Sequence, residues 1–428
     1  MLGHKSYLNY NDKISLSLLI SGILLLSFLA VSNKQPLIFD ERLFPPNVLL
    51  LEEYGLSEEF LLKMNNQAPG PLYQFIHYPL REITQMKQPG IRVVNIILFL
   101  GIIIIMYFIF NIIFNNEKLS LIYALNLVAV PVVWQIAGLA LTEIPSMLFA
   151  SFSLFFIVIM YTKINRYNKV NWSVYLYAVL SGICIGFAII GRATFLPVIS
   201  LIFLLLHYVK DTSLSISLVI LHLLPALLIC LPVFFIWQGL TPPAQAFTGE
   251  GMINIWHGIL AFAYAGIIFL LIAPKWYVVS KELIAIMLVF ASLCFLVNLF
   301  FFKFRYTPMS ESIYQFLPLQ LRPLYSYLMP ALFLTVAKYF FLSCLFRIVQ
   351  EKCSFVLIFS VLAMGLVLGT SIKITHLFSS RYVAQVAPYM IIAFAHYDSL
   401  DKFKSFRIIL AILIGFFSYN TYANYTIH

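Results

Sequence analysis

The chain of 428 residues is 62% hydrophobic and only 10% charged, and its formal net charge is +10 at pH 7. Soluble domains hold about 45–50% apolar and about 25% charged residues, so the composition excludes a soluble globular protein. The positive charge does not indicate a nucleic-acid partner, because Lys and Arg lie mainly in short loops and form no basic cluster interleaved with aromatic residues.

Apolar runs predict about thirteen membrane-spanning helices in a single transmembrane domain over residues 1–428. Several runs reach or approach the roughly 20 residues needed to cross about 30 Å of hydrocarbon. The first run follows Lys5 and Lys13 and ends in small residues, and we interpret it as an uncleaved anchor rather than a signal peptide. In chain order the predicted spans lie near 14–31, 93–114, 119–140, 144–161, 172–190, 194–209, 213–236, 255–273, 283–302, 324–346, 354–372, 383–397 and 407–423.

The first loop, residues 32–92, is too long to be a simple connector. It contains an amphipathic stretch from Val48 to Tyr54, and Ser57 has the character of an N-cap before the next apolar residues. After a break rich in Asn, Pro and Gly, a second stretch from Leu72 to Arg81 is rich in aromatic residues. These patterns predict helices that lie in the membrane interface.

The distribution of basic residues predicts the orientation. With the N-terminus inside, most Lys and Arg of the short loops also lie inside, as the positive-inside rule requires, and the first loop faces outward. Six cations break the rule, which we interpret as a need for positive charge on the outer side. They are Arg192, Lys303, Arg305, Arg322, Lys373 and Arg381.

Asp40 and Glu41 form an acidic pair early in the predicted outward loop. Neighbouring side chains point in different directions on a helix or a strand, so we do not expect the two to flank one bond as the acid and base of a glycosidase do. We expect instead that one carboxylate of the pair acts as a base and that the other orients it. Taken alone, the pair also fits an ordinary hydrated loop.

Six short motifs follow one another along most of the chain, and their order is more specific than any one of them. The order resembles the GT-C superfamily of polyprenyl-phosphate-sugar glycosyltransferases, particularly the branch of the protein O-mannosyltransferases and the lipid A aminoarabinose transferase. The motifs are Phe39-Asp40-Glu41, Gly70-Pro71-Leu72-Tyr73, Arg92-Val93-Val94-Asn95, Leu141-Thr142-Glu143-Ile144-Pro145, Gly191-Arg192-Ala193-Thr194 and Ser380-Arg381-Tyr382.

This resemblance implies an all-α polytopic membrane protein with the GT-C fold, about 13 transmembrane helices and interfacial helices in the first outward loop. It also implies inverting transfer of a sugar from an undecaprenyl- or dolichyl-phosphate donor to a hydroxyl of a glycolipid, a glycan or a protein. Asp40 then takes the role of catalytic base, with Glu41 as its companion. A positioned carboxylate suits that role, because it can take the proton of the hydroxyl as the new bond forms.

Positive charge must balance the departing lipid phosphate, and the planar fork of arginine binds phosphate oxygens at two points. Arg192 and Arg381 are the leading candidates, and Lys303, Arg305, Arg322 and Lys373 form a second tier; ordinary snorkelling at the interface is the alternative for each. Glu143 lies between two predicted spans, where it fits an N-terminal helix residue. The resemblance implies that Glu143 instead shapes the active site and orients the acceptor or a divalent cation, Mg²⁺ or Mn²⁺.

Two other classes of function stay open. A transporter or flippase of a lipid-linked saccharide would also use outward arginines, but the paired halves and midplane charges typical of transporters are not evident. A non-catalytic assembly subunit would tolerate loss of both Asp40 and Glu41. The compact chain favours a bacterial inner membrane over the endoplasmic reticulum, with the active site facing the periplasm or lumen.

Overall fold

The computed structural model describes residues 10–33, 36–165, 170–248, 253–308, 313–352, 354–374, 377–397 and 403–424, and the regular elements in these ranges are all helical. In this part of the chain, ten helical segments are long and apolar enough to cross a membrane. The helices that form these segments are α1 (Tyr10–Ser32), α6 (Gly90–Phe114), α9 (Glu143–Asn165), α10 (Trp172–Gly191), α12 (Thr212–Trp237), α13 (Ile255–Ile272), α14 (Lys281–Val297), α16 (Arg322–Gln350), α17 (Phe355–Gly369) and α20 (Lys404–Ala423).

Three of the thirteen predicted spans form shorter pieces, so the predicted count is not confirmed. Residues 119–140 lie in α7 (Glu117–Leu125), η3 (Asn126–Ala129) and α8 (Val133–Gly138). Pro131 stands between η3 and α8, where its missing N–H and its ring prevent one continuous helix.

The other two spans that do not form one long α-helix lie later in the chain. Residues 194–209 form the 3₁₀ helix η4 (Ala193–Leu204) and the short α11 (Leu205–Tyr208), and η4 contains Pro197. Residues 383–397 correspond to α18 (Arg381–Ala384) and α19 (Ala387–Tyr397). Hydropathy identified all three apolar runs, but it does not detect a break or a change of helix type inside an apolar run.

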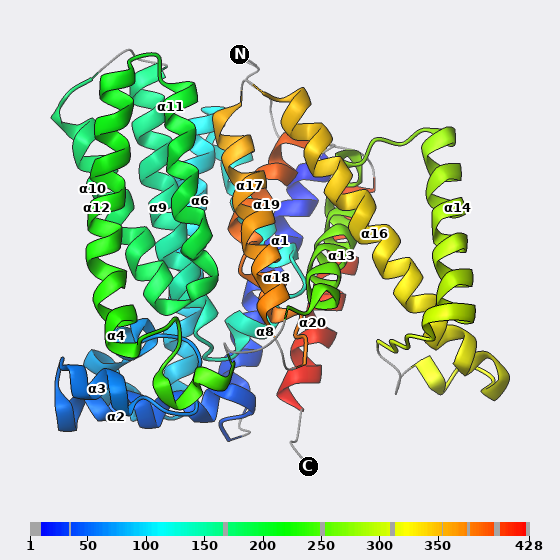
Figure 1. The fold of residues 1–428 in the computed structure, drawn as a ribbon, viewed down its shortest axis with the longest axis horizontal. Helices are drawn as coiled ribbons and strands as arrows, with labels where there is room; N and C mark the ends of the chain where they lie inside the picture. Colours follow the sequence, from blue (N-terminus) through cyan, green and yellow to red (C-terminus); the bar gives the residue numbers. More distant parts are fainter. Residues whose placement is uncertain are drawn as a thin grey trace.

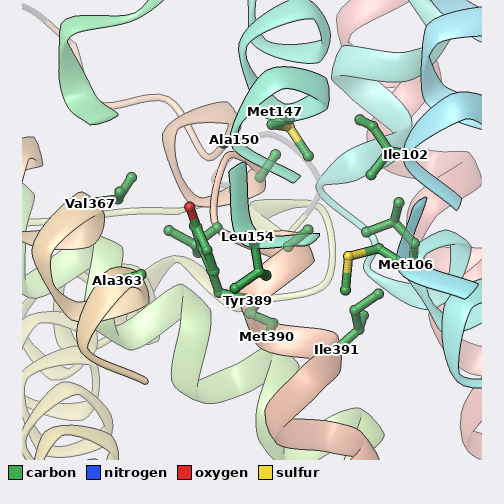
Figure 2. Close-up of a cluster of buried hydrophobic side chains, with 14 of the residues drawn as sticks. Ile102, Met106, Met147, Ala150, Leu154, Ala363, Val367, Tyr389, Met390 and Ile391 are labelled. Carbon is green, nitrogen blue, oxygen red and sulfur yellow. The ribbon is translucent and has the colours of Figure 1, made fainter. Parts of the chain in front are cut away.

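The helices pack into a bundle in which α10 lies against both α9 and α12, and α9 lies against α6 (Figure 1). A cluster of buried side chains fills the middle of the bundle. Figure 2 shows Met106 of α6, Leu154 of α9 and Tyr389 of α19 among its members. All three side chains are at most 2% exposed. The short helix α19 is thus surrounded by longer ones rather than by lipid.

The first loop forms short helices at the end of the bundle where α1 ends, here called the cavity end (Figure 1). Ser57 caps α3 by accepting a hydrogen bond from the backbone N–H of Phe60, 3.2 Å, as the sequence predicted. The Trp237 indole N–H at the end of α12 donates to the Leu61 carbonyl, 3.0 Å, and fastens α3 to the bundle. The helices of this loop are η1 (Phe39–Leu43), α2 (Phe44–Tyr54), α3 (Glu58–Lys63), α4 (Leu72–His77), η2 (Tyr78–Leu80) and α5 (Arg81–Thr84).

Candidate functional site

A cavity of about 540 Å³ opens at the cavity end of the bundle. Segments that are far apart in the sequence meet around it: η1, the loop 66–69, the end of α10, α18 and the end of α20. Its wall carries both charged and aromatic groups. The lining residues are Asp40, Leu43, Phe44, Asn66, Gln67, Ala68, Pro69, Arg192, Gln245, Leu377, Phe378, Ser379, Arg381, Tyr382, Thr421 and Tyr422.

Asp40 lies in the first turn of η1, and its side chain is 28% exposed at the cavity. One carboxylate oxygen is 2.5 Å from Nη1 of Arg381. The predicted base and a predicted phosphate ligand, which the sequence separates widely, are therefore in direct contact. The cavity gives this carboxylate access to a bound molecule.

Glu41 points away from the cavity into the protein. Its carboxylate accepts two hydrogen bonds from Arg92, 2.8 and 2.7 Å, and one from the backbone N–H of Ala140, 2.8 Å. A fourth comes from the N–H of Ile38, 3.2 Å, and neither Glu41 nor Arg92 is exposed. Asp40 and Glu41 thus diverge as expected for neighbours in a chain. Glu41 is placed to anchor η1 rather than to contact a substrate.

Glu143 is the first residue of α9 and is fully buried between two guanidinium groups. It forms an ion pair with Arg192, and its Oε1 is 3.8 Å from Nε of Arg381. The side chains of Arg192 and Arg381 are 11% and 9% exposed, and both line the cavity. Charges therefore alternate along the row Asp40, Arg381, Glu143, Arg192.

Local geometry sets the direction of the two arginines. Arg192 follows the last residue of α10 in an extended conformation, with φ −147° and ψ 109°, so its side chain leaves the helix axis. Arg381 begins α18, and the next turn carries Gln385. The Thr194 hydroxyl donates to the Gln385 side-chain oxygen, 2.5 Å, and joins the two segments.

Burial and neighbouring charges act in opposite directions on these arginines. Burial, followed by repulsion from Arg381, lowers the pKa of Arg192 to about 9. For Arg381, burial is outweighed by the carboxylate of Asp40, and the net effect raises the pKa. Both guanidinium groups therefore stay charged at neutral pH and can attract an anion.

The second-tier cations are not among the residues that line the cavity. Arg305 donates to the Tyr327 hydroxyl, 3.0 and 2.8 Å, and Arg322 donates to the carbonyls of Leu317, 3.3 Å, and Tyr314, 2.6 Å. Lys303 and Lys373 are exposed. The structure brings together two of the six predicted phosphate ligands and leaves the other four elsewhere on the surface.

Sequence reasoning missed two supports of the cavity, the first of which is Arg92. Arg92 lies at the end of the long first loop, and the positive-inside rule applies only to short loops, although Arg92 and Asn95 are one turn apart in the motif Arg92-Val93-Val94-Asn95. In the structure the Asn95 amide donates to the carbonyls of Ile136, 2.8 Å, and Leu139, 2.6 Å. Arg92 and Asn95 together hold the segment that leads to Glu143.

The second missed support is a buried amide network beneath the loop that lines the cavity. The Asn47 amide nitrogen donates to the Asn65 carbonyl, 2.7 Å, and to Gln67 Oε1, 2.9 Å, and the N–H of Asn65 donates back to Asn47, 3.0 Å. Gln74 also donates to Gln67, 2.7 Å. The Asn-Asn-Gln run predicts only a loop, whereas in the structure its amides are buried, which is favourable only because they bond to one another.

The carboxylates at the cavity do not fit a divalent cation. Among the described residues, no three His, Cys, Asp or Glu side chains gather in a group that could hold a metal ion. Asp40 faces one guanidinium and Glu143 faces two, so each carboxylate already has a positive partner. No chemical step at this site is therefore assigned to Mg²⁺ or Mn²⁺.

Comparison with solved structures identifies the fold. The oligosaccharyltransferase of Archaeoglobus fulgidus, in a complex with Zn and sulfate, aligns over 96% of this chain and 53% of its own, with a TM-score of 0.51 at 14% sequence identity. The chain has the GT-C fold. The fold that the motif order implied is thereby confirmed, and the chain spans about half the length of that oligosaccharyltransferase.

A further GT-C structure is also similar. ArnT from Cupriavidus metallidurans, bound to undecaprenyl phosphate, aligns over 94% of this chain and 77% of its own, at 14% identity and a TM-score of 0.47. No protein-family model matches the sequence, and no curated protein matches it. The GT-C fold of this chain is therefore apparent from its structure and motif order rather than from overall sequence identity.

Proposed function

We propose that this chain is a membrane glycosyltransferase that moves a sugar from a polyprenyl-phosphate donor to a hydroxyl acceptor with inversion at the anomeric carbon. One observation carries the proposal. A carboxylate and two guanidinium groups, from residues 40, 192 and 381, line a single cavity within a GT-C fold. A base and an anion-binding pair are the two elements that this reaction needs from the protein.

In the proposed reaction, Asp40 takes the proton of the acceptor hydroxyl as its oxygen attacks the anomeric carbon. The bond between that carbon and the phosphate oxygen breaks, and the phosphate leaves with the electron pair. Arg192 and Arg381 balance the charge that gathers on the leaving phosphate. Attack opposite to the leaving group inverts the anomeric centre in one step.

The mixed lining of the cavity suits a lipid-linked sugar. Leu43, Phe44 and Phe378 offer apolar contacts beside the charged groups, while Gln67 and Gln245 offer hydrogen bonds to sugar hydroxyls. The donor carrier is undecaprenyl or dolichyl phosphate, and the acceptor is a glycolipid, a glycan or a protein. The cavity end then faces the periplasm or the lumen, in a bacterial inner membrane or the endoplasmic reticulum.

Asp40→Asn tests the proposed base, because it keeps the shape of the side chain and removes its charge. Purified in detergent and given a defined polyprenyl-phosphate sugar, the variant is expected to lose about 10²–10⁴-fold in transfer, the usual contribution of a general base. The variant is expected to fold and to keep the ability to bind the lipid donor. Unchanged turnover would remove Asp40 from the mechanism.

The donor and acceptor are identified by mass spectrometry of glycolipids and surface glycans from cells with and without the gene. A sugar missing from one glycan identifies both substrates together. Translocation of a lipid-linked saccharide in proteoliposomes, without any sugar transfer, would instead support a flippase.

A further inference from the structure

Arg381 is shared between the proposed base and the proposed phosphate site. Its Nη1 lies 2.5 Å from Asp40, and its Nε lies 3.8 Å from Glu143. Building on the proposed function, we infer that Asp40 and the donor phosphate compete for the Arg381 guanidinium, so that binding of the donor releases the base. Before the donor binds, the ion pair with Arg381 holds the carboxylate of Asp40 in an inactive state.

Charge balance supports this competition. Asp40 and Glu143 carry two negative charges and Arg192 and Arg381 carry two positive charges, so the row is neutral when all four are engaged. A sugar phosphate attached to a polyprenyl chain is a phosphodiester with one negative charge. If Asp40 leaves the row, the other three side chains carry a net charge of +1, which matches that phosphodiester.

The difference in burial determines which carboxylate leaves Arg381 when the donor phosphate binds. Glu143 has no exposed surface and contacts both arginines, whereas the Asp40 side chain is 28% exposed at the cavity. Moving Asp40 into a water-accessible cavity costs less than leaving the buried Glu143 without a counter-charge. Glu143 therefore keeps the two guanidinium groups in place while Asp40 turns to the acceptor.

The same competition also links proton release to product release. After transfer, Asp40 holds the proton of the acceptor and is neutral, so it does not compete for Arg381. Once that proton passes to water, the restored carboxylate competes with the lipid phosphate for the guanidinium. Loss of the proton from Asp40 would therefore favour release of the lipid phosphate, and release of the lipid phosphate would favour loss of the proton.

The test measures binding of undecaprenyl phosphate and, in parallel, dolichyl phosphate to the purified full chain in nanodiscs. Asp40→Asn is expected to bind the preferred lipid at least about tenfold more tightly than the natural chain, the factor for one freed charge-assisted hydrogen bond. The same variant is inactive in transfer. Glu52→Gln, which removes an exposed carboxylate that pairs with Arg81, is the matched control and leaves affinity unchanged.

Repeating the measurement in an Arg381→Gln chain separates competition for Arg381 from simple repulsion between the Asp40 carboxylate and the phosphate. In an Arg381→Gln chain, Asp40→Asn should no longer tighten binding, because the shared guanidinium is gone. An equal gain in both backgrounds would overturn the competition, since it would arise from the lost negative charge alone. Inorganic phosphate at equal concentration distinguishes a lipid-phosphate site from a simple anion site: the lipid phosphates are expected to bind more tightly than inorganic phosphate to the natural chain, and equal affinities would show that the site does not recognise the lipid.

The outcomes also separate this inference from the proposed function. If Asp40→Asn abolishes transfer but the variant binds the lipid with unchanged or weaker affinity, Asp40 is still the proposed base, and the inferred competition for Arg381 is wrong. If Asp40→Asn transfers sugar normally, the proposed base is wrong, and the inference that depends on it is overturned as well.

Discussion

Arg92 donates one hydrogen bond to each carboxylate oxygen of Glu41, 2.8 and 2.7 Å, and neither side chain is exposed. This contact joins η1, which carries Asp40, to the start of α6. A third donor, the N–H of Ala140, ties the same carboxylate to the segment before Glu143. One buried ion pair therefore fixes the relative positions of the proposed base and of the residue that holds the arginines.

Glu41→Gln should destabilise the protein, because it leaves the Arg92 guanidinium buried without a counter-charge. Removing one partner of a buried ion pair costs about 3–5 kcal/mol. We expect a lower melting temperature in detergent and lower transfer activity. Glu52→Gln, at the surface, should show neither change, and a stable, active Glu41→Gln chain would contradict the anchoring role.

Arg381→Lys should weaken donor binding even though it keeps the charge. A lysine cannot reproduce the planar fork that, in the proposed complex, faces both Glu143 and the donor phosphate. We expect an increase in the KM for the donor of at least about tenfold, the loss of one charge-assisted hydrogen bond. Arg305→Lys is the control, because Arg305 binds Tyr327 away from the cavity. An equal loss in that control would restore a donor role to the second-tier cations.

His77 should make the protein less stable in acid. It is fully buried in α4, stacked on Tyr73 with 4.0 Å between ring centroids. Burial lowers the pKa of His77 to about 3, whereas an unfolded histidine has a pKa of about 6.5. Between these values only the unfolded chain binds the proton, so stability falls as pH falls, by on the order of 2 kcal/mol at about pH 5.

The measurement compares melting temperatures of the natural chain and of His77→Phe at about pH 5 and about pH 7.5. Phenylalanine keeps the stacking on Tyr73 and cannot take up a proton. The variant should lose less of its melting temperature in acid than the natural chain does. An identical acid dependence in both proteins would show that other groups cause it.

Gly182→Ala should separate α10 from α12. A Cβ atom at Gly182 would lie 2.1 Å from the carbonyl oxygen of His222, a backbone atom that cannot move aside cheaply. Overpacking of this kind typically costs about 1–3 kcal/mol. Gly365→Ala in α17 is the matched control, because no atom lies within 4 Å of its Cβ position. We expect a lower melting temperature only for Gly182→Ala, and equal values would mean that the two helices can adjust.

The membrane setting, the all-helical fold and the main candidates at the site could be predicted from the sequence. Apolar runs are local properties, so hydropathy located each of the ten long apolar helices in the part of the chain that the structure describes. Motif order then selected Asp40, Arg192, Glu143 and Arg381, which the structure brings into one row. For these residues the local pattern and the final position agree.

Which charges meet, and which apolar runs form one unbroken helix, could not be predicted from local sequence. Whether a cation reaches the cavity depends on helix packing between distant segments, which is why Arg381 contacts Asp40 while Arg305 pairs with Tyr327. The same holds for Glu41, whose partner Arg92 lies at the far end of the first loop. Contacts of this kind arise when segments pack, and no local window of sequence contains both partners.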